Sequence, residues 1–112
     1  MLIAIFSYFF LSAFDEDSFI KLTRDYAQSQ PIERQQLLNE HAKNMEADLQ
    51  TYVDISQEAA KTVKNTRLTR EEIKALLITY NDKRESTVQN IIDTRYKIKD
   101  ALSREEWEEA YN

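Results

Sequence analysis

His41 and Met45 are the two residues of this chain whose types and spacing best suit a metal ion. Residues four apart lie on one face of a helix, and this pair could ligate a soft or borderline metal if Glu40, Asp48 or a second subunit supplied oxygen atoms. His41 is the single histidine and there is no cysteine, which excludes a two-histidine or thiolate site. We expect no metal ion and no cofactor, and keep a metal sensor built on His41 and Met45 as an alternative.

Arg84 and Arg95 interrupt a regular apolar pattern, at positions that a helix would turn toward a neighbouring helix. A guanidinium without an acceptor is costly to remove from water, so each needs a carboxylate or a route to solvent. If the chain doubles back near residue 67, Asp48 or Asp54 lies opposite Arg84, and Glu40 lies opposite Arg95. We therefore expect Arg84, Arg95 and Asp48 to be buried polar residues that form register-setting ion pairs, or alternatively an anion site between helices.

Catalytic chemistry has little support in the sequence. The adjacent carboxylates fall on faces expected to be solvated, without loops to shape a pocket around them, whereas general acid–base catalysis needs a desolvated carboxyl group in a cavity. These pairs are Glu71 with Glu72, Glu105 with Glu106, and Glu108 with Glu109. We expect that the protein is not an enzyme.

The composition excludes further classes of site. The chain has no glycine among 112 residues, although about 7% is usual, so glycine-rich phosphate loops and nucleophile elbows are ruled out. Its 20 acidic and 15 basic residues give a net charge of −5. Binding to nucleic acid depends on clustered lysine and arginine, so we expect no nucleic-acid partner.

Two local modules mark where helices begin. Thr69 is followed three residues later by Glu72, and Ser103 by Glu106, which is the pattern of a capping box. An apolar residue precedes each box and can pack on the residue five positions further on, as Leu68 can on Ile73. The sequence therefore predicts helices that start at residues 69 and 103.

Apolar residues repeat at alternating spacings of three and four along two long stretches, which is the pattern of a heptad seam. The first seam lies in residues 31–65 and consists of Leu38, Ala42, Met45, Leu49, Tyr52, Ser56, Ala59 and Val63. The second lies in residues 69–102 and consists of Ile73, Leu77, Tyr80, Arg84, Thr87, Ile91, Arg95, Ile98 and Leu102. With about four residues between them, the two helices must double back as an antiparallel hairpin. Asn65 is the expected left-handed C-cap of the first helix.

Two short helices complete an all-α fold class. Residues 17–28 carry Phe19, Leu22 or Thr23, and Tyr26 at helical spacing, and Pro31 then ends this helix and starts the next one. Residues 103–111 form the short C-terminal helix. A two-helix hairpin cannot bury all of its apolar surface, so we expect dimerisation to complete the bundle.

The first 14 residues form a separate apolar segment without a charged side chain. A stretch of this length is too short to span a bilayer as a helix. It can be a signal peptide, a truncated membrane anchor or a packed helix, and it gives the chain a possible membrane association. Residues 15–112 are expected to form a single helical domain.

Several apolar residues flank the two seams and widen the apolar surface. They can belong to an intramolecular core, a dimer interface or a client-binding surface, and they are our candidates for partner binding. They are Val53, Ile55, Ala60, Leu76, Ile78, Val88 and Ile92.

The paired modules, at residues 68–72 and 102–106, resemble the LTxxQ motifs of Spy/CpxP-type periplasmic proteins, a group that includes metal-responsive relatives. The resemblance covers residues 31–107 as an architecture, with Glu72 and Glu106 where the family pattern has glutamine. It implies a periplasmic or otherwise extracytoplasmic homodimer that holds unfolded clients or reports envelope stress. We therefore expect a non-enzymatic protein that binds protein partners or unfolded clients, with a membrane-anchored structural adaptor as the alternative.

Overall fold

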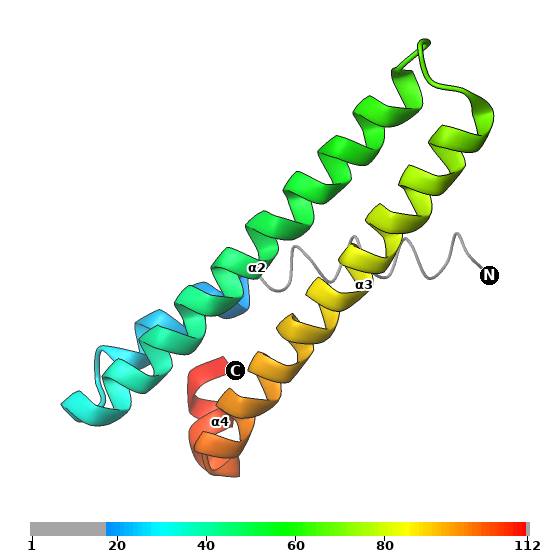
Figure 1. Ribbon diagram of the computed structural model, residues 1–112. Helices are drawn as coiled ribbons and strands as arrows, with labels where there is room; N and C mark the ends of the chain where they lie inside the picture. The colour runs from blue at the N-terminus through cyan, green and yellow to red at the C-terminus, as the bar shows by residue number, and fades with distance from the viewer. Residues whose placement is uncertain (1–17, 112) are drawn as a thin grey trace. The chain divides into compact units, whose positions relative to one another are not determined.

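The computed structural model describes residues 18–111, and these residues form an all-α fold (Figure 1). The chain is helical over residues 18–27, and three further helices follow: α2 spans Ile32–Lys64, α3 spans Arg70–Ala101 and α4 spans Arg104–Tyr111. The long helices α2 and α3 pack against each other as an antiparallel hairpin. The predicted all-α hairpin is confirmed, and the predicted ends of α2, α3 and α4 agree with the observed ones to within about one residue.

Both predicted capping boxes are present. The backbone N–H of Glu72 donates to Thr69 Oγ1 at 3.1 Å, and the N–H of Thr69 donates to Glu72 Oε1 at 3.3 Å. The same exchange joins Ser103 and Glu106, at 3.2 and 3.0 Å. Each box satisfies backbone donors that a helix start otherwise leaves without a partner, which explains why α3 and α4 begin where they do.

The turn between α2 and α3 differs from the predicted left-handed cap. Among the described residues none has a positive φ, so Asn65 does not adopt the left-handed conformation. Its side chain instead accepts a hydrogen bond from the Arg67 N–H at 3.0 Å, and its own N–H donates to the Thr62 carbonyl at 3.2 Å. The asparagine stabilises a turn through its side chain, which removes the need for a strained backbone.

The chain divides into two compact units, and both long helices contribute to each of them. The described part of the first unit contains residues 18–46 and 94–111, and the second unit contains residues 47–93. We call them the terminal unit and the turn unit.

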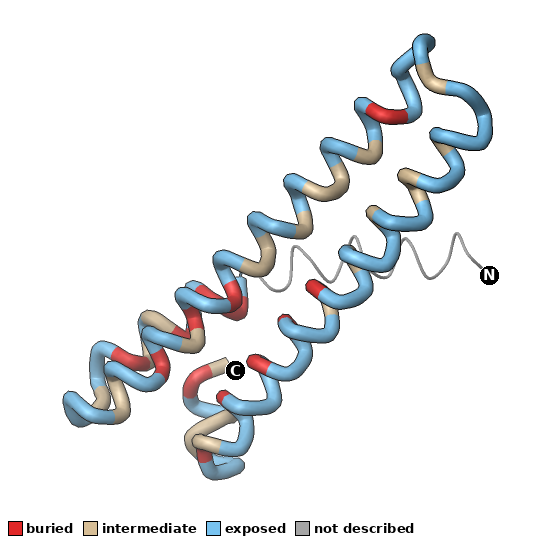
Figure 2. The backbone as a smooth tube through the Cα atoms, viewed as in Figure 1, coloured by how far each residue is buried: buried red, intermediate tan, exposed pale blue. Residues whose placement is uncertain are grey.

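The terminal unit contains most of the buried apolar side chains (Figure 2). They come from all four helical segments of this unit and from Leu102 between α3 and α4; those in the helices are Phe19, Ile20, Ala27, Leu38, Ala42, Met45, Ile98 and Ala110. Complete burial of a leucine or isoleucine side chain is worth about 2–3 kcal/mol, so these residues supply the main hydrophobic stabilisation of the described chain.

Three aromatic rings pack together in the terminal unit. The Phe19 and Tyr111 rings are stacked at 4.5 Å between centroids, and Trp107 lies 4.4 Å from Tyr111. The Tyr111 hydroxyl lies 2.7 Å from Thr23 Oγ1. Because the Thr23 hydroxyl donates its proton to the Phe19 carbonyl at 2.8 Å, Tyr111 is the donor in this contact. The cluster joins α4 to the helix of residues 18–27.

The turn unit is packed more loosely. Within residues 47–93, Ile91 is the one buried apolar residue, at 7% exposure. Thr62 and Thr87 are also buried, and their hydroxyls donate to the carbonyls four residues earlier, at 3.0 and 2.9 Å. Except for Val63, which is exposed, the remaining seam residues of this unit are half-buried, from Leu49 and Tyr52 in α2 to Ile73 and Leu77 in α3. The hairpin therefore leaves much apolar surface of residues 47–93 in contact with water.

Two seam positions were predicted one residue too far along the chain. Thr62 is buried and Val63 is 60% exposed, because α3 contacts the Thr62 side of α2, where Thr62 Oγ1 lies 3.5 Å from Tyr80 Oη. Likewise Thr94 is buried and Arg95 is exposed. A threonine in a helix can satisfy its hydroxyl on its own backbone, whereas a buried guanidinium loses its hydration, so the smaller side chain takes the interior position.

Candidate interaction surface

Val53 and Ala60 lie seven residues apart on one side of α2 in the turn unit. Each directly follows a half-buried seam residue, Tyr52 or Ala59. Both are exposed, and the Val53 side chain is 44% accessible. A spacing of seven returns to the same helix face, so these two apolar residues belong to one stripe.

A matching stripe runs along α3. Ile78, Glu85 and Ile92 recur every seven residues, and Val88 lies four residues before Ile92, so all four share one face. Ile78 and Ile92 are 55% and 40% exposed, and Val88 is half-buried.

The stripes of α2 and α3 lie on the same side of the hairpin. Val88 directly follows the buried Thr87, as Val53 follows Tyr52. Because two packed antiparallel helices are related by an approximate twofold axis, the residue after equivalent seam positions lies on the same side in both. We call Val53, Ala60, Ile78, Val88 and Ile92 the apolar side of the turn unit.

The other two candidates for partner binding, Ile55 and Leu76, lie elsewhere. Each precedes a seam residue, Ser56 or Leu77, and so falls on the opposite flank of its helix. Both are half-buried. The structure thus divides the seven candidates between two flanks of the hairpin and leaves one flank more accessible to a partner.

The three polar candidates have different environments. Arg84 is half-buried and donates to Asn81 Oδ1 at 3.0 Å, one turn earlier in α3. Arg95 is exposed, and its guanidinium lies 5.2 Å from the centre of the Phe19 ring, where the cation faces the π electrons. Asp48 is half-buried, and burial raises the pKa of its carboxyl group. These contacts are compatible with structural roles for all three.

His41 is half-buried in the terminal unit, whereas Met45 is fully buried. Burial lowers the pKa of His41, the nearby Lys97 lowers it further, and Glu40 acts in the opposite direction. Among residues 18–111, no group of three or more histidine, cysteine, aspartate or glutamate side chains is arranged to hold a metal ion. Met45 acts in this structure as a core side chain.

A contact that the sequence did not reveal joins α2 to the start of α4. Arg34 donates through Nη1 to Glu106 Oε2, and its Nη2 donates to the Ala101 carbonyl at 2.7 Å. The pKa of Glu106 is lowered, first by the backbone hydrogen bond from Ser103 and then by the side chains of Ser103 and Arg34. The capping box predicts the position of Glu106, but no local pattern points to a partner 72 residues away.

The aromatic cluster of Phe19, Trp107 and Tyr111 was also missed. The spacing of Trp107 and Tyr111 was an available signal, because aromatic residues four apart share a helix face. Which helix would cover them depends on long-range packing.

The predictions for residues 1–14 lie outside the residues that the structure describes. Within the described helices, none combines the length and the apolar character needed to cross a bilayer. Comparison of the chain with protein-family models, with curated proteins and with solved structures finds no significant match in any of the three.

Proposed function

We propose that this chain is a non-enzymatic helical protein that binds protein partners or unfolded clients through the apolar side of its turn unit. The observation that carries the proposal is the exposure of Val53, Ile78 and Ile92, at 44%, 55% and 40%, on one side of the hairpin. Single exposed apolar residues are common on protein surfaces, but aligned stripes of them are typical of binding surfaces.

The expected affinity is modest. Covering the exposed part of three aliphatic side chains is worth about 1 kcal/mol each, or about 3 kcal/mol together. A millimolar dissociation constant corresponds to about 4 kcal/mol, so these residues need additional contacts to give even weak binding. Such binding is reversible and fits a protein that holds a client without enclosing it.

The surroundings of the apolar side are polar. Asn81 and Glu85 lie between the apolar residues of α3, and both are exposed. Polar groups that border an apolar centre keep the free protein soluble and can hydrogen-bond to a bound chain. This arrangement supports binding of an extended or unfolded segment.

An extracytoplasmic location belongs to the same proposal. It is supported by the apolar composition of residues 1–14 and by the resemblance of the two capping modules to periplasmic hairpin proteins. Mass spectrometry of the natively expressed chain, after cell fractionation, tests it. A mature protein that begins near Phe14 in the extracytoplasmic fraction supports export, and an intact chain in the cytoplasm contradicts it.

The binding function is tested by the aggregation of reduced α-lactalbumin, measured by light scattering in about 0.15 M salt to weaken surface charge effects. We expect the protein to suppress scattering in molar excess. The variant Val53→Lys/Ile78→Lys should lose most of this effect, because two cations would replace the centre of the apolar side.

The matched control is Leu22→Lys/Ile32→Lys, which adds the same charge at exposed apolar residues of the terminal unit. Circular dichroism confirms that both variants keep their helical content. If the control variant loses protection as fully as Val53→Lys/Ile78→Lys, or if the unaltered protein has no effect in excess, the proposal is wrong.

A further inference from the structure

Lys74, Ile78 and Glu85 form a linear arrangement on the apolar side of α3. Ile78 lies four residues after Lys74 and seven before Glu85, so all three share one face of the helix. All three are exposed. A basic and an acidic residue therefore stand at the two ends of a stretch of about 16 Å, with an exposed isoleucine between them.

The charges of this arrangement are complementary to those of a second copy that runs in the opposite direction. The midpoint between Lys74 and Glu85 falls between residues 79 and 80, and Ile78 lies about 2 Å from it along the helix. If two copies of α3 meet in opposite directions about a twofold axis at this midpoint, each lysine faces the other copy's glutamate. The two Ile78 side chains then meet next to the axis.

The opposite orientation is disfavoured. In a parallel pair with equal register, lysine would face lysine and glutamate would face glutamate, and like charges opposite each other are destabilising. The charges thus select one orientation, whereas the apolar residues alone would allow several.

Val53 lies at the same level of the hairpin. The turn is centred near residue 67, between the end of α2 at Lys64 and the start of α3 at Arg70. Residue 53 therefore lies opposite residue 81, within one helical turn of the midpoint. A second copy seated on Ile78 would also cover Val53, which extends the interface onto α2.

We propose that the apolar side of the turn unit binds a second copy of this chain, in an antiparallel, isologous pair centred near residues 79 and 80. The inference rests on the proposed function in one respect, because both assign binding to the same apolar side. The second copy occupies this surface when no client is present, and a client competes with it.

The test is sedimentation velocity over a range of protein concentrations, with four charge variants. Lys74→Glu places a carboxylate opposite Glu85 at both symmetry-related contacts, and Glu85→Lys places two ammonium groups opposite each other. The double variant Lys74→Glu/Glu85→Lys restores opposite charges in the same geometry. Lys83→Glu is the control, because it makes the same charge change on another face of α3.

We expect the unaltered chain to dimerise and each single charge reversal at residue 74 or 85 to weaken the dimer about tenfold. The double variant should recover the original affinity, and an equimolar mixture of the two single variants should associate more tightly than either alone. Lys83→Glu should leave the dimer unchanged. Higher salt should weaken the dimer of the unaltered chain.

The proposal is overturned if the unaltered chain stays monomeric up to about 1 mM, or if the double variant is as weak as the single variants. Circular dichroism excludes loss of folding as the cause. The α-lactalbumin assay separates the two proposals. A monomer that still suppresses aggregation leaves the client function standing without the dimer, and a dimer that gives no protection leaves the dimer standing without the client function.

Discussion

Arg34 is a single residue of α2 that contacts both α3 and α4. One guanidinium reaches the Glu106 carboxylate and the Ala101 carbonyl, and so connects the first turn of α2 with the end of α3 and the start of α4. The carboxylate is held in place by the Ser103 backbone and hydroxyl contacts of its own capping box. A short helix such as α4 is not stable in isolation, so these contacts and the aromatic cluster keep it folded.

We predict that Arg34→Gln destabilises the protein at pH 7 and does so less at a pH below the folded-state pKa of Glu106. The pKa of Glu106 is lowered below the usual 4.5 in the folded state, so its stabilising contribution is present above that value and is lost as the pH falls through the folded-state pKa. Urea unfolding at both pH values measures the difference. Arg70→Gln, at an exposed arginine of α3, should be near neutral. Equal effects of the two substitutions would contradict a stabilising role of the Arg34 contact.

His41 gives the fold a second pH dependence, which arises from a basic side chain and not from a carboxyl group. Its pKa is lowered below 6.5 in the folded state, by burial first and by Lys97 second, so the unfolded chain binds the proton more readily. Stability should therefore be complete above pH 6.5 and should decrease as the pH falls below it. In His41→Gln this decrease should be absent. Melting temperatures at pH 7.5 and pH 5.5 test the prediction, and an identical pH dependence in both proteins would contradict it.

At the scale of the helices, burial along α2 is uneven. Its seam residues Leu38, Ala42 and Met45 in the terminal unit are fully buried, whereas Leu49 and Tyr52 in the turn unit are half-buried. The same heptad pattern therefore leads to two degrees of burial, because only the terminal unit has additional helical segments that cover the seam.

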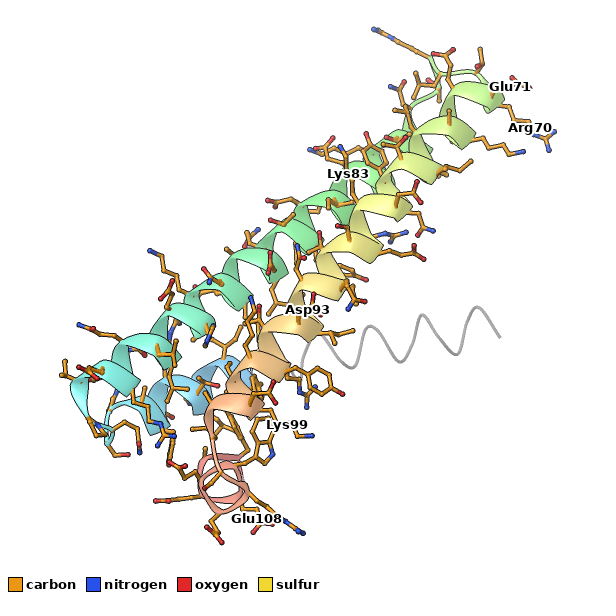
Figure 3. The ribbon with its side chains drawn as sticks, turned by 60° about the horizontal axis from the view of Figure 1, so that its bottom comes forward. Arg70, Glu71, Lys83, Asp93, Lys99 and Glu108 are labelled. Carbon is orange, nitrogen blue, oxygen red and sulfur yellow. The ribbon has the colours of Figure 1, made fainter. Side chains whose placement is uncertain are left out.

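Exposed charged side chains such as Arg70 and Glu71 extend outward from the first turn of α3 (Figure 3).

A pair of matched substitutions tests this difference. We expect Leu38→Ala to lower the free energy of unfolding by about 3 kcal/mol, because the leucine is completely buried and its removal leaves a cavity. Leu49→Ala, at another position of the same seam, should cost about 1 kcal/mol, since its side chain is already in contact with water. Chemical denaturation measures both values. A larger effect at Leu49 than at Leu38 would show that the core lies elsewhere.

The helix ends were predictable because their signals are local. Thr69 and Ser103 cap their own helices through residues three positions away, so the sequence alone contains both partners. Two seam positions were not predictable in this way, because Thr62 and Thr94 owe their burial to the path of the neighbouring helix. The prediction of a left-handed cap at Asn65 was wrong, because an asparagine can stabilise a turn either through its backbone conformation or through its side chain. Here its side chain accepts a hydrogen bond.

At the scale of the whole described chain, the buried core and the proposed binding surface fall in different units. The terminal unit combines the buried core, the aromatic cluster and the Arg34 contact. The turn unit exposes the apolar side, and its buried residues are Thr62, Thr87 and Ile91. The sequence pattern identifies all seven flanking apolar residues as candidates, but it does not show how exposed each one is, because exposure depends on where the opposite helix packs.

Methyl NMR tests the central claim most directly, because it reports on the apolar side itself. The protein is labelled at its isoleucine and valine methyl groups and titrated with reduced α-lactalbumin. We predict that the signals of Val53, Ile78 and Ile92 shift or broaden, while Ile32, which is 65% exposed in the terminal unit, does not change. Changes at Ile32 with unaltered signals from Val53, Ile78 and Ile92 would contradict the account.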